Sequence, residues 1–376
     1  MKITIAIDSF KGSLSSIEAG SAASLGIKRV FPSADITILP IADGGEGTVN
    51  ALVSGLGGKL QHAIVTGPIG DKIDATYGII NDTAIIEMAE AAGLNLVPNN
   101  KRNPMYTTTY GLGELIKDAY ENGCTKYIIG IGGSSTNDGG AGMLQALGFK
   151  LTDANNDDIS YGASGLSVLH NISDSEVPAY LKECQFDVAC DVTNPLFGPN
   201  GCSMIFAPQK GASNEEILLM DSYMKSYSDI CKKYNPSANP DIPGSGAAGG
   251  LGFAFNTFLN ATLKAGTQIV FDAVNLEKHI SNSDIVITGE GRIDSQTIMG
   301  KAPIAIASLA HKYNKNVIAF CGCASLDASI CNDHGIDAIF PILRNPCSIE
   351  EALDKETASR NLSETACQVF RLISTM

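Results

Sequence analysis

Short apolar segments alternate with segments of helical periodicity at both ends of the chain. Five of them have the length and composition of buried strands, namely Ile3–Ile7, Asp35–Ile41, Asp284–Thr288, Asn316–Cys321 and Ala338–Ile342. Helices are expected between and after them, including Ala302–Tyr313 and Ser348–Ser374. Strands that alternate with helices form parallel sheets, in which ligands bind at the carboxyl edge. The pattern predicts a flavodoxin/Rossmann-like α/β domain.

The middle of the chain has a different pattern. Short strands at His62–Val65, Ala75–Ile80 and Ala84–Met88 are separated by Gly-Pro and Asn-Asp turns, which is typical of an antiparallel or mixed sheet. We therefore expect a discontinuous first domain over residues 1–60 and 280–376 and an inserted mixed α/β domain over residues 61–279. A cleft between two such domains would be the natural site for a ligand.

A glycine-rich loop stands at the centre of the predicted inserted domain. The apolar strand Tyr127–Ile131 leads into the loop 132–140, GGSSTNDGG, and then into a helix that ends at Gly148. Glycines let backbone N–H groups approach a ligand, and a helix N-terminus favours negative charge, so the loop suits an anion such as phosphate. Asn137 or Asp138 can cap the helix. A simple connecting turn is the alternative interpretation of this loop.

A second glycine-rich stretch, residues 244–250 (GSGAAGG), formally matches the pattern G-x-G-x-x-G. The residues before it do not form a buried strand, so the stretch is weak as a dinucleotide fingerprint. We expect it to open a helix, either to receive a phosphate or to allow close helix packing.

Composition narrows the class of protein. The chain has 376 residues, of which 44% are hydrophobic and 18% charged, and its net charge is −14. This acidity argues against nucleic acid or an anionic membrane as a partner. Ten cysteines without a C-x-x-C pair indicate reduced thiols, and we expect a cytoplasmic protein without a signal peptide or membrane span. The five histidines have no metal-ligand spacing, which argues against a histidine-built zinc site.

Acidic residues and lysines recur just beyond the predicted strands. Each could be a turn former or a helix cap, but together they suit phosphoryl transfer, which needs Mg²⁺, positive charge near the moving group and a carboxylate that accepts a proton. The chain lacks a Walker A motif and the protein-kinase signatures. These positions are Asp8, Lys11, Asp43, Glu46, Asp138, Asp191, Lys210, Glu290, Arg292, Asp294 and Lys301.

Seven sequence blocks together resemble the type I glycerate kinase family. They occur in the family's order and span nearly the whole chain. The blocks are DSFKGS at 8–13, PIADGGEGT at 40–48, GIGGSSTNDGGAGMLQALG at 130–148, ACDVTNPLFGPNG at 189–201, FAPQKGAS at 206–213, GSGAAGGLG at 244–252 and TGEGRIDSQTIMGKAP at 288–303. Ile7 stands where many relatives have Pro, and Ser135 where many have Ala. Neither departure affects a charged position.

The resemblance implies a two-domain enzyme that uses ATP and Mg²⁺ to phosphorylate D-glycerate in the cleft between its domains. Bacterial members are usually assigned 2-phosphoglycerate as product, which favours 2-phosphoglycerate over 3-phosphoglycerate here. An ATP-dependent kinase of another small hydroxy acid, and a non-catalytic two-domain protein that binds a small anion, are the alternatives. The oligomeric state, monomer or homodimer, stays open.

Roles can be placed on the positions that the family pattern marks. Asp191 is the candidate catalytic base or Mg²⁺ ligand, and Lys11 and Lys210 are candidates for holding the glycerate carboxylate or the transferring phosphoryl group. Other metal ligands would be Asp43 and Glu46. The remaining substrate positions are Asp8, Ser9 and Arg292, and the nucleotide and phosphate positions are Gly132, Gly133, Ser134, Ser135, Asn137, Asp138, Gly139, Glu290, Asp294 and Lys301.

Overall fold

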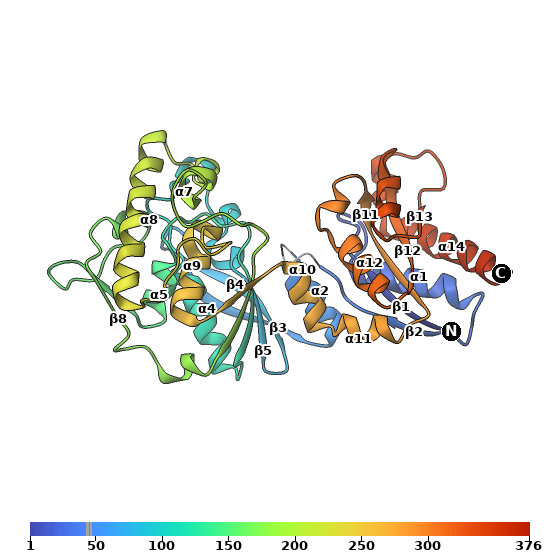
Figure 1. Cartoon of the computed structure of the whole chain (residues 1–376), viewed down its shortest axis with the longest axis horizontal. Helices are drawn as coiled ribbons and strands as arrows, with labels where there is room; N and C mark the ends of the chain where they lie inside the picture. Colours follow the sequence, from blue (N-terminus) through green and yellow to red (C-terminus); the bar gives the residue numbers. More distant parts are fainter. Residues whose placement is uncertain (43–44, 46) are drawn as a thin grey trace. The chain divides into compact units, whose positions relative to one another are not determined.

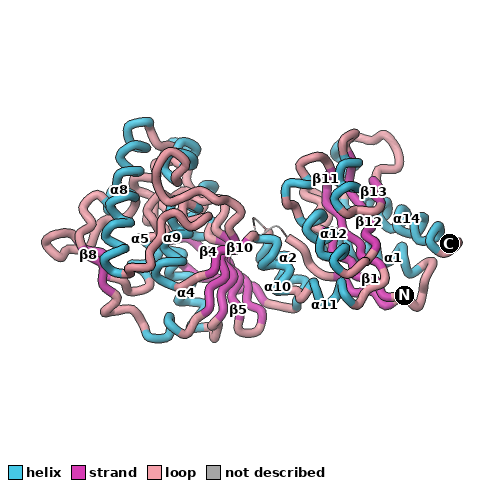
Figure 2. Tube along the Cα trace, in the orientation of Figure 1, coloured by secondary structure: helices cyan, strands magenta, loops and turns pink. Residues whose placement is uncertain are grey.

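The computed structural model describes residues 1–42, 45 and 47–376. The chain divides into two compact units, which we describe separately. Unit 1 comprises Met1–Asp43, Asn50–Gly57 and Val270–Met376, and unit 2 comprises Gly44–Val49 and Gly58–Ile269. Each unit is built around its own β-sheet (Figure 2).

Unit 1 contains a five-stranded parallel sheet with the order β13-β12-β11-β1-β2. In chain order within the unit this is 2-1-3-4-5 read from the β2 edge, which is the flavodoxin-like order. The predicted α/β fold with a parallel flavodoxin-like sheet is therefore confirmed. The strands are β1 (Lys2–Ile7), β2 (Asp35–Ile38), β11 (Ile285–Ile293), β12 (Asn316–Ala324) and β13 (Ala338–Pro341).

Helices cover both faces of this sheet (Figure 1). The helices α1 (Ser16–Lys28) and α14 (Lys355–Ile373) pack against each other on one face, where Ile27, Leu362 and Phe370 are fully buried. The capping box formed by Ser15 and Glu18 begins α1. On the other face, α12 (Ala302–Lys312) packs against β11 and β12. The helices α2 (Thr48–Leu56) and α10 (Gly266–Ala273) both span the unit boundary, and α11 (Leu276–Ser281) lies in unit 1.

The C-terminal segment differs from its prediction as one continuous helix. It forms α13 (Ile349–Leu353) and α14, separated at Asp354. Asp354 has an extended ψ of 125°, and its side chain accepts a hydrogen bond from Thr357 N at 2.9 Å, which caps α14. An aspartate with this local bond competes with the continuous helix that the apolar spacing predicted.

Unit 2 contains a mixed six-stranded sheet with the order β10-β9-β6-β5-β4-β3, and the mixed pairing predicted for this region is confirmed. The pairs β3/β4 and β4/β5 are antiparallel, whereas the pairs from β5 to β10 are parallel. The strands are β3 (Lys59–Thr66), β4 (Lys72–Ile80), β5 (Thr83–Glu87), β6 (Lys126–Gly130), β9 (Gln185–Ala189) and β10 (Thr262–Lys264). A separate hairpin-like pair consists of β7 (Lys150–Thr152) and β8 (Asn171–Ser173).

The helices of unit 2 share one large apolar core with this sheet. In this core α4 approaches α5 so closely that a Cβ on Gly113 would lie 2.5 Å from the carbonyl oxygen of Met143. The helices are α3 (Ala89–Ala92), α4 (Tyr110–Glu121), α5 (Ala141–Ala146), α6 (Ala163–Leu166), α7 (Cys202–Phe206), α8 (Asn214–Tyr234) and α9 (Ala247–Leu259). In the described part of the chain, no helix combines the length and hydropathy needed to cross a membrane.

Candidate functional site

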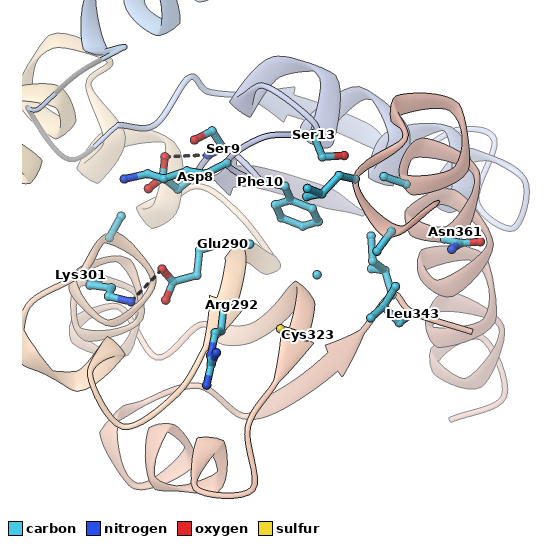
Figure 3. Close-up of a pocket in the computed structure, with 18 residues that line it drawn as sticks. Asp8, Ser9, Phe10, Ser13, Glu290, Arg292, Lys301, Cys323, Leu343 and Asn361 are labelled. Atoms are coloured by element: carbon cyan, nitrogen blue, oxygen red, sulfur yellow. Dashed lines mark hydrogen bonds and ion pairs between the residues drawn. The ribbon is translucent and has the colours of Figure 1, made fainter. Parts of the chain in front are cut away.

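A cavity of 460 Å³ lies in unit 1 at the carboxyl ends of β1, β11 and β12. This is the edge at which parallel α/β sheets bind ligands, and β1 and β11 flank the point where the strand order reverses. Figure 3 shows Glu290 and Lys301 at one end of the cavity and Leu343 beyond Phe10 at the other. Six predicted site residues line it, namely Asp8, Ser9, Lys11, Glu290, Arg292 and Lys301.

The charged end of this cavity is held by Glu290 near the end of β11. Its carboxylate accepts a hydrogen bond from Thr297 Oγ1 at 2.7 Å and lies 3.4 Å from Lys301 Nζ. Burial raises the pKa of Glu290, although Thr297 and Lys301 act in the opposite direction. Asp294 lies 3.2 Å from Arg292 Nε and 4.0 Å from Lys301 Nζ. The result is a compact set of alternating charges that can hold both phosphate oxygens and a cation.

Unit 2 holds a cavity of 350 Å³ beside the glycine loop. The loop lies at the carboxyl end of β6, and the segment after β9 lies next to it because these strands pair in parallel. Five predicted site residues line this cavity, namely Gly132, Gly133, Ser134, Asp191 and Lys210.

Lys210 is the principal cation of this cavity, and its side chain is only 2% exposed. It follows α7 at the end of a single 3₁₀ turn, Pro208–Lys210. Its Nζ donates hydrogen bonds to Ser134 Oγ at 2.7 Å and to the carbonyl oxygen of Thr136 at 2.6 Å. Burial lowers the pKa of Lys210 to about 8. An anionic ligand favours the charged form of such an ammonium, because a nearby opposite charge offsets the cost of burial.

Asp138 fixes the far end of the glycine loop and is fully buried. Its carboxylate accepts hydrogen bonds from Thr109 N at 2.9 Å, Thr109 Oγ1 at 2.8 Å, Gly140 N at 3.1 Å and Gly142 N at 3.2 Å. Burial raises the pKa of Asp138, and these hydrogen bonds oppose that shift. The N–H groups of Gly140 and Gly142, at the start of α5, are thus already bound to a carboxylate of the protein itself. Of the loop residues, Gly132, Gly133 and Ser134 line the cavity.

The rest of the loop also lies behind the cavity. Ser135 and Asn137 are buried, with Ser135 Oγ bonded to the carbonyl oxygen of Ala92 and Asn137 Nδ2 to Ser203 Oγ. Gly139 N donates to the carbonyl oxygen of Gly249 at 2.9 Å, and a Cβ on Gly249 would lie 2.1 Å from the carbonyl oxygen of Thr136. The second glycine-rich stretch therefore packs directly against the glycine loop, which agrees with the close-packing interpretation of its glycines. Residues 248–250 have left-handed φ values, and so the regular part of α9 begins after them.

Asp191 lies just beyond β9 and is exposed to the cavity of Lys210. Its Oδ1 accepts a hydrogen bond from the backbone N of Gly266, at the start of α10, at 3.0 Å. This bond orients the carboxylate without burying it. An exposed, oriented carboxylate beside a buried ammonium can take up a proton or contact a cation.

A cavity of 500 Å³ shares Gly132 and Gly133 with that of Lys210 and contains residues that sequence reasoning did not identify. Arg102 and Glu87 line it. Arg102 Nε and Nη2 each lie 3.3 Å from a backbone carbonyl oxygen, of Val97 and Leu94 respectively, and Glu87 Oε1 accepts from Val49 N at 3.0 Å. Glu87 is the last residue of β5 and lies at the carboxyl edge of the sheet, a position from which the sequence could have identified it as a candidate site residue. Arg102 lies in a loop without such a signal.

The predicted site residues thus fall into two sets, one in each unit. Lys210 and the glycine loop are in unit 2, whereas Lys11, Arg292, Glu290, Asp294 and Lys301 are in unit 1. The predicted metal ligands Asp43 and Glu46 lie outside the described residues. Among the residues that are described, no three His, Cys, Asp or Glu side chains form a ready-made metal site.

The chain is similar over its whole length to proteins named as glycerate kinases. It is 50% identical over 372 residues to the "Glycerate 2-kinase" of Escherichia coli (strain K12), covering 97% of this chain and 98% of that protein. It is 47% identical over 381 residues to the "Glycerate kinase" of Bacillus subtilis (strain 168), covering 100% and 99%. A crystal structure of a protein assigned as glycerate kinase 2 from Salmonella typhimurium LT2 superposes with a TM-score of 0.91 at 46% identity, covering 100% and 98%.

The fold and these relatives define a kinase that acts on a small molecule. The model of the "Glycerate kinase family" matches residues 3–374. The chain belongs to the glycerate kinase family, as the seven sequence blocks predicted. This membership sets aside the non-catalytic binding protein considered as an alternative.

Proposed function

We propose that this enzyme transfers the γ-phosphoryl group of ATP to a hydroxyl of D-glycerate in a Mg²⁺-dependent reaction, with 2-phosphoglycerate favoured over 3-phosphoglycerate. The observation that carries the proposal is the cavity of unit 2, where a buried ammonium, an exposed carboxylate and a glycine loop line one space. The product is suggested by the printed name of the Escherichia coli relative, "Glycerate 2-kinase".

The proposed reaction is balanced by one proton transfer. The hydroxyl oxygen of glycerate forms a bond to the γ-phosphorus, and the bond between that phosphorus and the β,γ-bridging oxygen breaks, so that ADP leaves with the electron pair. The hydroxyl proton moves to the carboxylate of Asp191, our candidate base. Its hydrogen bond from Gly266 N uses one carboxylate oxygen in the described structure and orients the group as a whole.

Lys210 would hold an anion in this cavity, either the carboxylate of glycerate or the phosphoryl group in transfer. Its two short hydrogen bonds to the glycine loop fix the position of Nζ, so its charge is already placed before the ligand arrives. Arg102 lines the adjoining cavity and supplies a second cation. Glycerate brings one negative charge in its carboxylate and gains more when its hydroxyl is phosphorylated, so two cations suit the acid and its product.

The charged end of the unit 1 cavity suits the polyphosphate of the nucleotide. Lys301 and Arg292 supply cationic donors, and Glu290 and Asp294 hold them in place. Lys11, Asp8 and Ser9 line the same cavity and stay candidates for contact with the phosphoryl or glycerate groups. Asp8 Oδ1 accepts a hydrogen bond from the backbone N of Ser9 at 2.7 Å, which shapes this turn.

The donor set also fits Mg²⁺. This cation usually keeps several waters and takes only one or two protein carboxylates together with phosphate oxygens, so a preformed cluster of three ligands is not required. Asp191 supplies an exposed carboxylate of the right kind, and Asp43 and Glu46 stay proposed partners. When bound, Mg²⁺ would neutralise charge on the phosphate oxygens. The chain itself would do the positioning and the proton transfer.

The test is to incubate the purified protein with ATP and D-glycerate, with Mg²⁺ or with EDTA, and to identify the product by ³¹P NMR. We expect 2-phosphoglycerate and ADP in equal amounts, and no turnover with EDTA. D-lactate, which has only the 2-hydroxyl, and 3-hydroxypropionate, which has only the 3-hydroxyl, check which position is phosphorylated. ATP left intact with D-glycerate, or faster phosphorylation of another hydroxy acid, would overturn the proposal.

A further inference from the structure

We infer that the apolar part of the unit 1 cavity binds the purine base of ATP. This inference rests on the proposed function and adds the place and the surface that would recognise the nucleoside. The apolar part is the wall formed by Phe10, Ile342, Leu343, Ala352, Leu353 and Ala358.

The cavity combines two environments that a nucleotide needs together. The charged residues Glu290 and Lys301 lie at one end, and Leu343 lies at the opposite end, with the ring of Phe10 between them (Figure 3). A purine base is a flat apolar ring system joined to a strongly anionic chain. The base would occupy the apolar end while the phosphates meet Lys301 and Arg292.

Two glycines leave the lining of the cavity open beside the ends of β11 and β12. A Cβ on Gly322 would lie 2.5 Å from the carbonyl oxygen of Gly291, so the packing of these strands requires glycine there. A Cβ on Gly291 would meet nothing closer than 3.5 Å, an ordinary contact. The fold therefore does not require glycine at position 291. Its missing side chain enlarges the cavity, which indicates space kept for a ligand.

D-glycerate does not account for this cavity. At 460 Å³ the space falls within the range of roughly 300–1,000 Å³ that is usual for ligand pockets and is large for a three-carbon acid. Every carbon of glycerate carries a polar oxygen, so burying it against leucine, isoleucine and phenylalanine would leave those oxygens without partners. A nucleoside matches both the size and the apolar wall.

The chain contains a natural reporter for this site. Cys323 lines the cavity and is exposed, and Cys347 is also exposed but lies outside the cavity lining. Alkylation of both thiols with iodoacetamide can be followed by mass spectrometry in the presence of Mg²⁺ with AMP-PNP, adenosine, inorganic triphosphate or D-glycerate. We expect AMP-PNP and adenosine to slow alkylation of Cys323 at least fivefold and to leave Cys347 unchanged. Triphosphate and D-glycerate should leave both thiols unchanged.

A cavity-filling variant gives an independent measurement. In Ala352→Phe the new ring would occupy the apolar end, and we expect the KM for ATP to rise at least tenfold while the KM for D-glycerate stays within twofold. The matched control is Glu350→Phe, which adds the same ring to an exposed position of α13 outside the cavity lining. It should change neither constant, and circular dichroism would check the folding of both variants.

The outcomes separate this inference from the proposed function. If AMP-PNP binds by calorimetry and ATP is consumed, but Cys323 stays unprotected and Ala352→Phe has a normal KM for ATP, the base lies elsewhere and the inference is wrong. If the protein neither binds AMP-PNP nor consumes ATP with D-glycerate, the proposed function itself fails.

Discussion

The Nζ of Lys210 lies 2.7 Å from Ser134 Oγ, so the ammonium of Lys210 is held by a hydrogen bond to the glycine loop. The two residues are 76 positions apart in the sequence and line the same cavity. A lysine that is buried and held in this way has little freedom to lose when an anion binds. Its charge state also changes within the pH range in which enzymes are assayed.

Lys210 should make the binding of D-glycerate depend on pH. Because its pKa is lowered to about 8, it is charged below that pH and becomes neutral above it. If Lys210 binds the carboxylate, the KM for D-glycerate should be constant at neutral pH and rise about tenfold for each pH unit well above 8. Steady-state kinetics across this range would check it. Lys210→Arg, which stays charged, should remove the inflection, and an unchanged inflection in that variant would assign the effect to another group.

Asp191→Asn should lower kcat by about 10²- to 10⁴-fold, because the amide cannot accept the hydroxyl proton. Its oxygen can still accept the hydrogen bond from Gly266 N, so the fold should persist. The affinity for AMP-PNP, measured by calorimetry, should stay near that of the unmodified enzyme. Asp241→Asn changes an exposed loop carboxylate of the same unit and serves as the control. Near-normal turnover in Asp191→Asn would exclude the base role.

Lys301→Met should raise the KM for ATP about tenfold and have little effect on the KM for D-glycerate, because it removes a cation from the charged end of the unit 1 cavity. It also leaves the buried Glu290 without its nearest cation, so the pKa of Glu290 should rise further. Lys312→Met, at the exposed end of α12, is a matched control. A larger change in the KM for D-glycerate than in that for ATP would contradict this assignment.

Asp138→Ala should destabilise the protein by about 3 kcal/mol or more, since Thr109, Gly140 and Gly142 would each keep a buried donor without a partner. Urea unfolding followed by circular dichroism measures this loss. Asp138→Asn keeps an acceptor oxygen and should lose less. If Asp138 instead contacts the nucleotide directly, the Asn variant would keep its stability and lose affinity for AMP-PNP.

The sequence predicted the sheets well because strand-forming segments carry a local signal. Apolar segments such as Ile3–Ile7 (Lys2–Ile7 in the structure) and acidic residues just after them follow from periodicity and the geometry of parallel strands. Three features had no such signal. The three-residue strand β10 is too short to recognise, the break at Asp354 interrupts an unbroken apolar pattern, and β7 and β8 pair only through the tertiary structure.

The candidate site was predictable as a set of residue types but not in its arrangement. The sequence pattern groups Lys210 with Lys11 and Arg292, and the structure places Lys210 in unit 2 and the other two in unit 1. It could not show that Lys210 is buried, because burial of a lysine depends on partners such as Ser134 and Thr136 from a distant segment. Nor could the sequence show that the carboxylate of Asp138 accepts hydrogen bonds from the N–H groups of Gly140 and Gly142 at the start of α5.

The break at Asp354 has a consequence for how this family could diversify. It separates a short helix without buried residues, α13, from the well-packed α14, yet both contribute to the same cavity wall through Ala352, Leu353 and Ala358. Substitutions in α13 can therefore reshape that wall without disturbing the hydrophobic core. If the purine base lies against this wall as proposed, the preference for one base over another can change through the five residues of α13 with little loss of stability, because none of them is buried.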